Sequence, residues 1–262
     1  MKRLQMRKIA WTMATVLFLA AGIQPRAAAQ AASPQGVKNI VLVHGAWADG
    51  SSWSKVIAIL QAKRFHVIAV QNPLTSFADD VAATKRAIAS MDGPVILVGH
   101  SYAGVVITEA GNDPKVVGLV YVAAVAPAEG ESLNSVGKPY PPTPINSEVR
   151  LDPQGFLTVT PKGIAEDMAQ DLTPKEQQVL AATQGETAAP DFAATVTTAA
   201  WRTKPSWFVI AGNDRAISPA LEKDEAAAIK ATSITLPANH LVMLSHPKEV
   251  AELIERAAAR AK

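Results

Sequence analysis

Short apolar runs rich in β-branched residues alternate with helix-length segments along most of this chain, and this alternation is the strongest constraint on its fold. The runs that predict strands cover residues 39–44, 66–70, 95–98, 117–122, 206–211 and 233–236. Segments with helical spacing of apolar residues separate them, over 53–63, 77–90, 104–110, 219–231 and 247–259. Continuous hydrophobicity indicates strands that are buried on both faces. The pattern therefore predicts an α/β fold with a mostly parallel sheet and helices on both faces.

The alternation stops between residues 127 and 201. Four prolines fall within residues 139–144, and no strong strand pattern is present. A weak amphipathic helix is expected within 167–182, with Thr173 and Pro174 at its start. Long irregular insertions in compact domains are often functional. We therefore predict an inserted cap at about 127–201, and an irregular surface excursion is the alternative.

The first 31 residues have the order of a secretory signal peptide. Residues 1–8 contain four basic side chains, residues 9–23 are uncharged and largely apolar, and small residues follow. The apolar run is shorter than the ~20 residues that a membrane span needs. We expect cleavage between Ala29 and Ala32, export to the periplasm or the medium, and one mature domain over 32–262. An uncleaved anchor is the alternative.

Composition restricts the partners and cofactors of the mature chain. Residues 1–31 contain five basic side chains and no acid, so the net charge of +2 for the whole chain becomes −3 without them. No dense basic stripe remains to neutralise phosphates, which argues against a nucleic-acid partner. The absence of cysteine excludes disulfides, thiolate nucleophiles and cysteine-based metal sites. We expect neither a metal nor an organic cofactor.

The most informative motif lies at residues 95–104, where an apolar strand leads directly into Ser101 and then into a helix. The small neighbours Gly99 and Ala103 suit a tight strand-to-helix turn that leaves the serine hydroxyl projecting. Ala103 replaces the last glycine of the G-x-S-x-G pattern, and Gly104 follows it. The alternative is that Ser101 only caps the helix.

A serine nucleophile needs a base, and the chain offers five histidines. His240 follows the last predicted strand and is the favoured base, whereas His246 precedes Pro247 at a helix entry. His44 ends the first strand, where a structural hydrogen bond is expected. His66 opens a strand, and His100 is expected to point away across the turn.

The orienting acid is expected on a loop after a strand and before the histidine. Asp214 follows the strand at 206–211 and satisfies this order, although an aspartate near a glycine is also a common turn former. The strand that ends near Ala126 has no acid before Glu129, so that location is poorly supplied.

An acyl-transfer site also needs N–H donors for the developing oxyanion. The N–H of Tyr102, directly after the serine, is one candidate, and the N–H of Ala46, in the loop after the first strand, is the other. Trp47 is expected at the mouth of a substrate pocket, with ordinary packing as the alternative.

Four motifs together, HGAW, GHSYAG, GNDRAISP and NHLVMLSHP, resemble the α/β-hydrolase superfamily. The resemblance spans residues 37–258. More narrowly, it is similar to the small esterase branch of plant methyl-ester esterases, hydroxynitrile lyases and pyrethroid-hydrolase-like bacterial proteins.

The resemblance implies that Ser101 is the nucleophile, Asp214 the acid and His240 the base, with Ala46 and Tyr102 as the oxyanion hole. It does not transfer substrate identity. We expect hydrolysis of a small carboxylic ester through an acyl-enzyme. A hydroxynitrile lyase or a cofactor-free perhydrolase on the same triad is an alternative, and a non-catalytic binding protein is another. The oligomeric state is not predicted.

Overall fold

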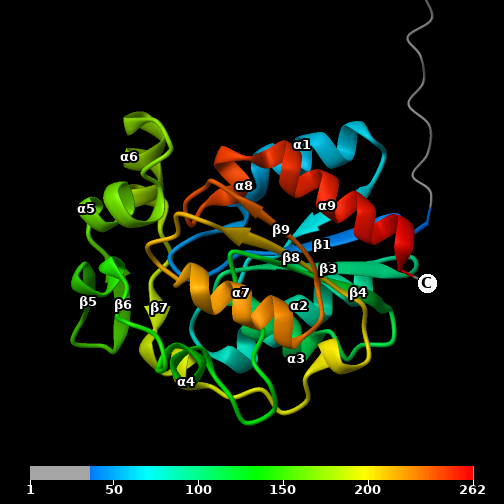
Figure 1. The fold of residues 1–262 in the computed structure, drawn as a ribbon, viewed down its shortest axis with the longest axis horizontal. Helices are drawn as coiled ribbons and strands as arrows, with labels where there is room; N and C mark the ends of the chain where they lie inside the picture. The colour runs from blue at the N-terminus through cyan, green and yellow to red at the C-terminus, as the bar shows by residue number, and fades with distance from the viewer. Residues whose placement is uncertain (1–35, 262) are drawn as a thin grey trace, which may run out of the picture. The chain divides into compact units, whose positions relative to one another are not determined.

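The computed structural model describes residues 36–261, so the predicted signal peptide and its cleavage site lie outside the described residues. Six strands form one sheet in the order β2-β1-β3-β4-β8-β9, and every neighbouring pair is parallel (Figure 1). The strands are β1 (Asn39–Val43), β2 (His66–Ala69), β3 (Val95–His100), β4 (Val116–Val122), β8 (Ser206–Ala211) and β9 (Thr232–Leu236). The predicted α/β fold with a parallel sheet is confirmed.

Helices cover both faces of this sheet (Figure 1). One face packs against α1 (Ser54–Ala62), α8 (Val242–Ser245) and α9 (Pro247–Arg260), and the other against α2 (Phe77–Ser90), α3 (Ala103–Ala110) and α7 (Pro219–Ala228). Neighbouring residues of β1 show the division, because Leu42 packs in the same cluster as Leu253 of α9, whereas Val41 packs with Val105 of α3. None of the helices within residues 36–261 combines the length and apolar character needed to cross a membrane.

Most predicted boundaries agree with the structure to within a few residues. Helix α2 and strand β8 have the predicted limits. Helix α7 ends at Ala228, three residues before the predicted end. The reason is local. Lys230 has a left-handed backbone conformation with φ of 54°, and an α-helix cannot extend through such a residue. Residues Gly50–Trp53, just before α1, form a short 3₁₀ helix.

The segment between β4 and β8 has its own small antiparallel sheet, of order β5-β6-β7. Its elements are α4 (Leu133–Gly137), β5 (Val149–Leu151), β6 (Phe156–Val159), α5 (Pro161–Gly163), a π-helical turn (Ile164–Met168), α6 (Pro174–Thr183) and β7 (Thr187–Ala188), with 3₁₀ turns at Pro144–Ser147, Ala189–Ala193 and Ala200–Arg202. The strands have two to four residues, which is too short for an alternating pattern to be seen in the sequence.

Helix α6 begins where the sequence indicated. The side chain of Thr173 accepts a hydrogen bond from the backbone N–H of Glu176, and the Glu176 carboxylate accepts one from the N–H of Thr173. This reciprocal cap satisfies two backbone donors that a helix start otherwise leaves free.

Helix α3 lies unusually close to the segment after β4. A Cβ atom added to Gly104 would overlap the carbonyl oxygen of Val125. Position 104 therefore has space only for glycine. Position 103, where the serine motif more often has glycine, holds alanine.

We predict that Gly104→Ala destabilises the protein by about 1–3 kcal/mol or more, because the new methyl group meets backbone that cannot rotate away. Chemical denaturation monitored by circular dichroism measures the change. Gly137→Ala is the matched control, since a Cβ there meets nothing within 4 Å. Equal denaturation midpoints for the two variants would contradict the close packing of α3.

Candidate active site

Ser101 occupies the turn between β3 and α3 in a strained conformation. Its φ is 57°, in the left-handed region that residues with a Cβ rarely adopt. The turn leaves no room nearby. A Cβ on Gly99 would lie 2.7 Å from the carbonyl oxygen of Ala103, and a Cβ on Gly45 would lie 2.7 Å from the Cβ atom of Ser101. The predicted strand–serine–helix turn is therefore present, with the hydroxyl held outside the helix.

Three side chains that are far apart in the sequence form one hydrogen-bonded chain. Nε2 of His240 lies 2.8 Å from Oγ of Ser101, and Nδ1 lies 2.6 Å from Oδ2 of Asp214. All three residues are buried. An ionised carboxylate can only accept, so Nδ1 of His240 is the protonated nitrogen and Nε2 is free to accept the serine proton. This is the geometry in which a hydroxyl can lose its proton to an imidazole.

Asp214 is fixed by its own loop. Its Oδ1 accepts hydrogen bonds from the backbone N–H groups of Ala216, at 2.6 Å, and Ile217, at 2.9 Å. Together with His240, three donors therefore satisfy the carboxylate. The turn-former interpretation and the orienting-acid interpretation both apply to this residue, because the turn that it forms aims Oδ2 at the histidine.

The insertion holds the loop that contains His240. The N–H of Asn239 donates to Oδ2 of Asp171, at 3.1 Å, and the N–H of Leu241 donates to the carbonyl of Met168, at 3.2 Å. Both backbone neighbours of His240 are thus bound to the segment between β4 and β8. The position of the imidazole therefore depends on the insertion as well as on the sheet.

The two residues expected to supply the oxyanion donors lie beside the serine in one cavity. Ala46 and Tyr102 line the same cavity as Ser101, and within residues 36–261 neither backbone N–H donates to a protein acceptor. Tyr102 precedes α3, so its N–H is one of the free donors at a helix start. Free N–H groups beside a serine hydroxyl can stabilise negative charge on a substrate oxygen.

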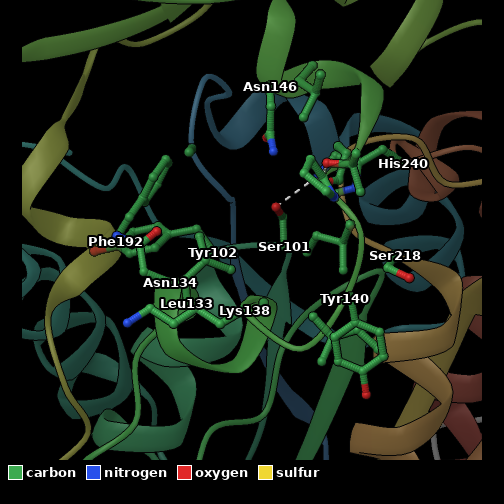
Figure 2. Close-up of a pocket in the computed structure, with 18 of the residues that line it drawn as sticks. Ser101, Tyr102, Leu133, Asn134, Lys138, Tyr140, Asn146, Phe192, Ser218 and His240 are labelled. Carbon is green, nitrogen blue, oxygen red and sulfur yellow. Dashed lines mark hydrogen bonds between the residues drawn. The ribbon is translucent and has the colours of Figure 1, made fainter.

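A cavity of about 390 Å³ opens above Ser101. Figure 2 shows Phe192 and Tyr102 on one side of the serine, His240 on the other, and the side chain of Asn146 directed toward the serine hydroxyl. Many lining residues come from the insertion and were not identified from the sequence: Leu133, Asn134, Gly137, Lys138, Tyr140, Pro141, Pro142, Thr143, Ile145, Asn146 and Phe192. Among the described lining residues Lys138 is the single lysine, arginine, aspartate or glutamate.

Trp47 lies where the sequence placed it, among the residues that line this cavity. Its ring meets Phe192 edge to face, with centroids 5.5 Å apart, and its Nε1 donates to the carbonyl of Leu157 at 3.0 Å. The tryptophan thus both lines the cavity and binds the loop after β1 to the insertion.

Two further histidines support the site from below. The N–H of Asn72 donates to Nε2 of His44, at 2.9 Å, so Nδ1 donates to the carbonyl of Gly45. Burial lowers the pKa of His44, in agreement with this neutral form. His100 donates from Nε2 to the backbone carbonyl of His240, at 3.0 Å, and burial lowers its pKa well below the ordinary value.

The remaining candidates lie outside the site. His66 contacts Asn39 at 3.2 Å, and His246 contacts a neighbouring serine hydroxyl before α9. Glu129 pairs with Arg202 at 2.7 Å. No group of three or more acidic or histidine side chains gathers within the described part of the chain in a way that could hold a metal ion.

The side chain of Tyr102 rests on a buried carboxyl group. Its hydroxyl donates to Oδ2 of Asp80 at 3.1 Å, while Oδ1 of Asp80 accepts the N–H of Leu74 at 2.9 Å. Burial is the main cause that raises the pKa of Asp80 to about 6. The two hydrogen bonds oppose this rise, and the nearby carboxyl groups of Asp191 and Asp79 add a smaller increase. This carboxyl group therefore gains its charge only near neutral pH.

A parallel sheet whose central strand ends in a strained serine, bonded through a histidine to an aspartate from later loops, defines the class of α/β hydrolases. The chain belongs to the alpha/beta hydrolase family, whose profile matches residues 40–253. This match covers most of the chain and confirms the resemblance inferred from the four motifs.

Individual relatives are distant. The alpha/beta hydrolase nvfD of Aspergillus novofumigatus (strain IBT 16806) is 25% identical over 244 residues, which are 85% of this chain and 97% of that protein. A carbendazim hydrolyzing esterase of Nocardioides sp. (strain SG-4G) is 36% identical over 111 residues, 36% of this chain and 45% of that protein. The crystal structure of a pyrethroid hydrolase from Sphingobium faniae JZ-2 matches with a TM-score of 0.72 and 21% identity, covering 86% of this chain and 98% of that chain. The last similarity is one of fold.

We predict that Asp80→Asn changes how stability depends on pH. Folding raises the pKa of this carboxyl from 3.8 to about 6. The folded protein therefore loses about 3 kcal/mol of stability as the pH rises through this range. Wild type should therefore become less stable, relative to Asp80→Asn, between pH 4 and pH 7. Urea denaturation across this range measures the difference. Asp92→Asn, which removes an exposed carboxylate, is the control, and identical pH profiles for all three proteins would contradict the assignment.

Proposed function

We propose that this chain is a serine esterase that hydrolyses a small carboxylic ester through an acyl-enzyme. The observation that supports this most directly is the hydrogen-bonded chain from Asp214 through His240 to Ser101 at the floor of a cavity. Membership of the alpha/beta hydrolase family and the partial identity to an esterase agree with it.

In the first half of the proposed reaction, Oγ of Ser101 attacks the ester carbonyl carbon while its proton moves to Nε2 of His240. The carbonyl oxygen becomes an oxyanion, which the N–H groups of Ala46 and Tyr102 stabilise. Asp214 keeps the imidazole in the required tautomer and stabilises its positive charge. The tetrahedral intermediate then expels the alkoxide, which leaves as an alcohol with the proton from His240.

In the second half, water enters and gives a proton to the same Nε2 as its oxygen attacks the acyl carbon. The second tetrahedral intermediate breaks its bond to Oγ of Ser101, which regains the proton. The carboxylic acid leaves and the enzyme returns to its starting state. These steps use only Ser101, His240, Asp214 and the two backbone N–H groups, so no cofactor enters the proposal.

The cavity supports small substrates with an apolar group beside the ester. Its volume of about 390 Å³ lies at the low end for small-molecule sites. Aromatic rings of Trp47, Tyr140 and Phe192 and a pair of prolines contribute to its wall. Asn146, directed toward the serine (Figure 2), offers an amide that can orient a polar substituent.

The same triad on this scaffold is compatible with cyanohydrin cleavage or perhydrolysis, and no contact in the site favours either. A panel of p-nitrophenyl esters, cyanohydrins and peracid formation separates the three reactions. A non-catalytic binding protein would bind ligands without turning over any of them.

We propose in addition that the protein is exported. The order of basic, apolar and small residues in 1–31 supports this.

We predict that Ser101→Ala lowers kcat for the best ester of the panel by about 10⁴-fold or more, because the triad residues act as a unit. A fluorophosphonate probe should label wild type and fail to label this variant. Ser147→Ala, at an exposed serine of the insertion, should be labelled as wild type is. Folded wild type that hydrolyses no ester and takes up no probe would contradict the proposal and favour a binding protein.

For export, we predict that full-length protein produced in a Gram-negative host reaches the periplasm with a new N-terminus between Ala29 and Ala32. Fractionation and N-terminal sequencing measure both properties. A chain without residues 2–31 should stay in the cytoplasm. Recovery of the full-length chain with residues 1–31 intact in the cytoplasm would contradict export.

A further inference from the structure

Helix α7 places a second carboxyl group behind Asp214. Glu222 lies in the first turn of α7, eight residues after Asp214, and none of its surface is exposed. Its Oε2 accepts the N–H of Ala211, at 2.9 Å. Ala211 is the last residue of β8, the strand that leads into the loop of Asp214. The mechanism described above does not use this buried acid.

Few groups near Glu222 favour a negative charge, namely the backbone N–H of Ala211 and, weakly, the charge of Lys223. Its Oε1 has no hydrogen-bond donor among residues 36–261. The charged groups that act on it are the Asp214 carboxylate and, more weakly, Lys223, whose side chain is exposed. A buried carboxylate without a cation is costly, and a neighbouring carboxylate increases the cost. Two such groups side by side cannot both keep their charge.

The donors around the two acids decide which one holds the proton. Asp214 accepts from the N–H groups of Ala216 and Ile217 and from His240, whereas Glu222 accepts from one backbone N–H. Hydrogen bonds to an ionised carboxylate favour the charged form. Burial, followed by the charge of Asp214, raises the pKa of Glu222 well above its ordinary value. These surroundings favour the neutral form of Glu222.

A proton on Oε1 of Glu222 would let this buried oxygen, which has no hydrogen-bond partner among the described residues, act as a donor. A protonated carboxyl is a donor, and a carboxylate has about four acceptor sites, of which three on Asp214 are in use. We propose that Glu222 is a positioning residue that stays protonated and donates this hydrogen bond to Asp214, which fixes the aspartate against His240. The catalytic part of this inference rests on the proposed esterase function.

The activity test compares Glu222→Gln with Glu222→Leu. Glutamine keeps a neutral donor toward Asp214, whereas leucine has similar bulk and no donor. We expect Glu222→Leu to lower kcat about tenfold or more with little change in KM, as for loss of a hydrogen bond to a charged group, and Glu222→Gln to restore most of kcat. Equal kcat for the two variants, both high or both low, would overturn the positioning role.

Glu225→Gln is the matched control. Glu225 lies on the same helix, and its carboxylate accepts the N–H of Ala126 at 2.7 Å, away from Asp214. Burial raises its pKa to about 7. Its replacement should change the pH dependence of stability and leave kcat as in wild type. A fall in kcat equal to that of Glu222→Leu would mean that any buried acid of α7 has this effect.

The proton on Glu222 can be tested by two measurements that need no activity assay. At pH 8 the infrared spectrum of folded wild type should contain the C=O stretch of a protonated carboxylic acid, which persists in Glu225→Gln and disappears in Glu222→Gln. Urea denaturation should also show that wild type loses stability between pH 5 and pH 8 more steeply than Glu222→Gln, because the folded state retains a proton that the unfolded state releases.

Absence of the infrared band, together with equal pH dependence of stability in the two proteins, would overturn the proposal even in an active enzyme. A band in a protein that hydrolyses no ester would reject the proposed function and leave the proton on Glu222 established.

Discussion

The left-handed backbone of Ser101 is the constraint on which the rest of the site depends. A positive φ at a residue with a side chain costs roughly 1–3 kcal/mol, and it persists only where surrounding packing enforces it. Here the enforcement is steric, because Gly45, Gly99 and Gly104 each lie where a Cβ would collide with its surroundings. The strand, the loop after β1 and helix α3 are thereby drawn together. The hydroxyl of Ser101 therefore projects toward the loops at the carboxyl end of the sheet, where it meets His240.

Burial of the triad then creates an electrostatic problem that the fold solves by supplying donors. Asp214 is surrounded by backbone N–H groups and an imidazole, and its charge is acceptable for that reason. The supporting histidines His44 and His100 are kept neutral by burial and use their N–H groups for backbone carbonyls. The inferred proton on Glu222 follows the same rule, since it removes a charge that the interior has no donors left to satisfy.

The sequence predicted the parallel sheet and the meeting of Ser101, His240 and Asp214 because these features depend on local patterns. Apolar runs define the strands, and parallel strands bring their carboxyl-terminal loops to one edge. The sequence did not predict a role for Glu222. It is followed by Lys223, Asp224 and Glu225, a charged stretch typical of an exposed helix face, and its burial depends on how α7 packs. The short strands β5 to β7 were not predicted because two to four residues are too few to show an alternation of apolar and polar side chains.

The insertion was the least predictable part of the chain, and it forms much of the cavity wall. Residues such as Asn146 and Phe192 reach the cavity through turns whose directions are set by tertiary contacts and by no repeating pattern. The same segment binds the backbone on both sides of His240. A change in the insertion can therefore alter the cavity wall and the placement of His240 together. The sheet and its loops hold Ser101 and Asp214, whereas the position of the imidazole depends on the insertion as well, so a change in the cavity wall is tolerated only as far as the insertion still holds His240 in place.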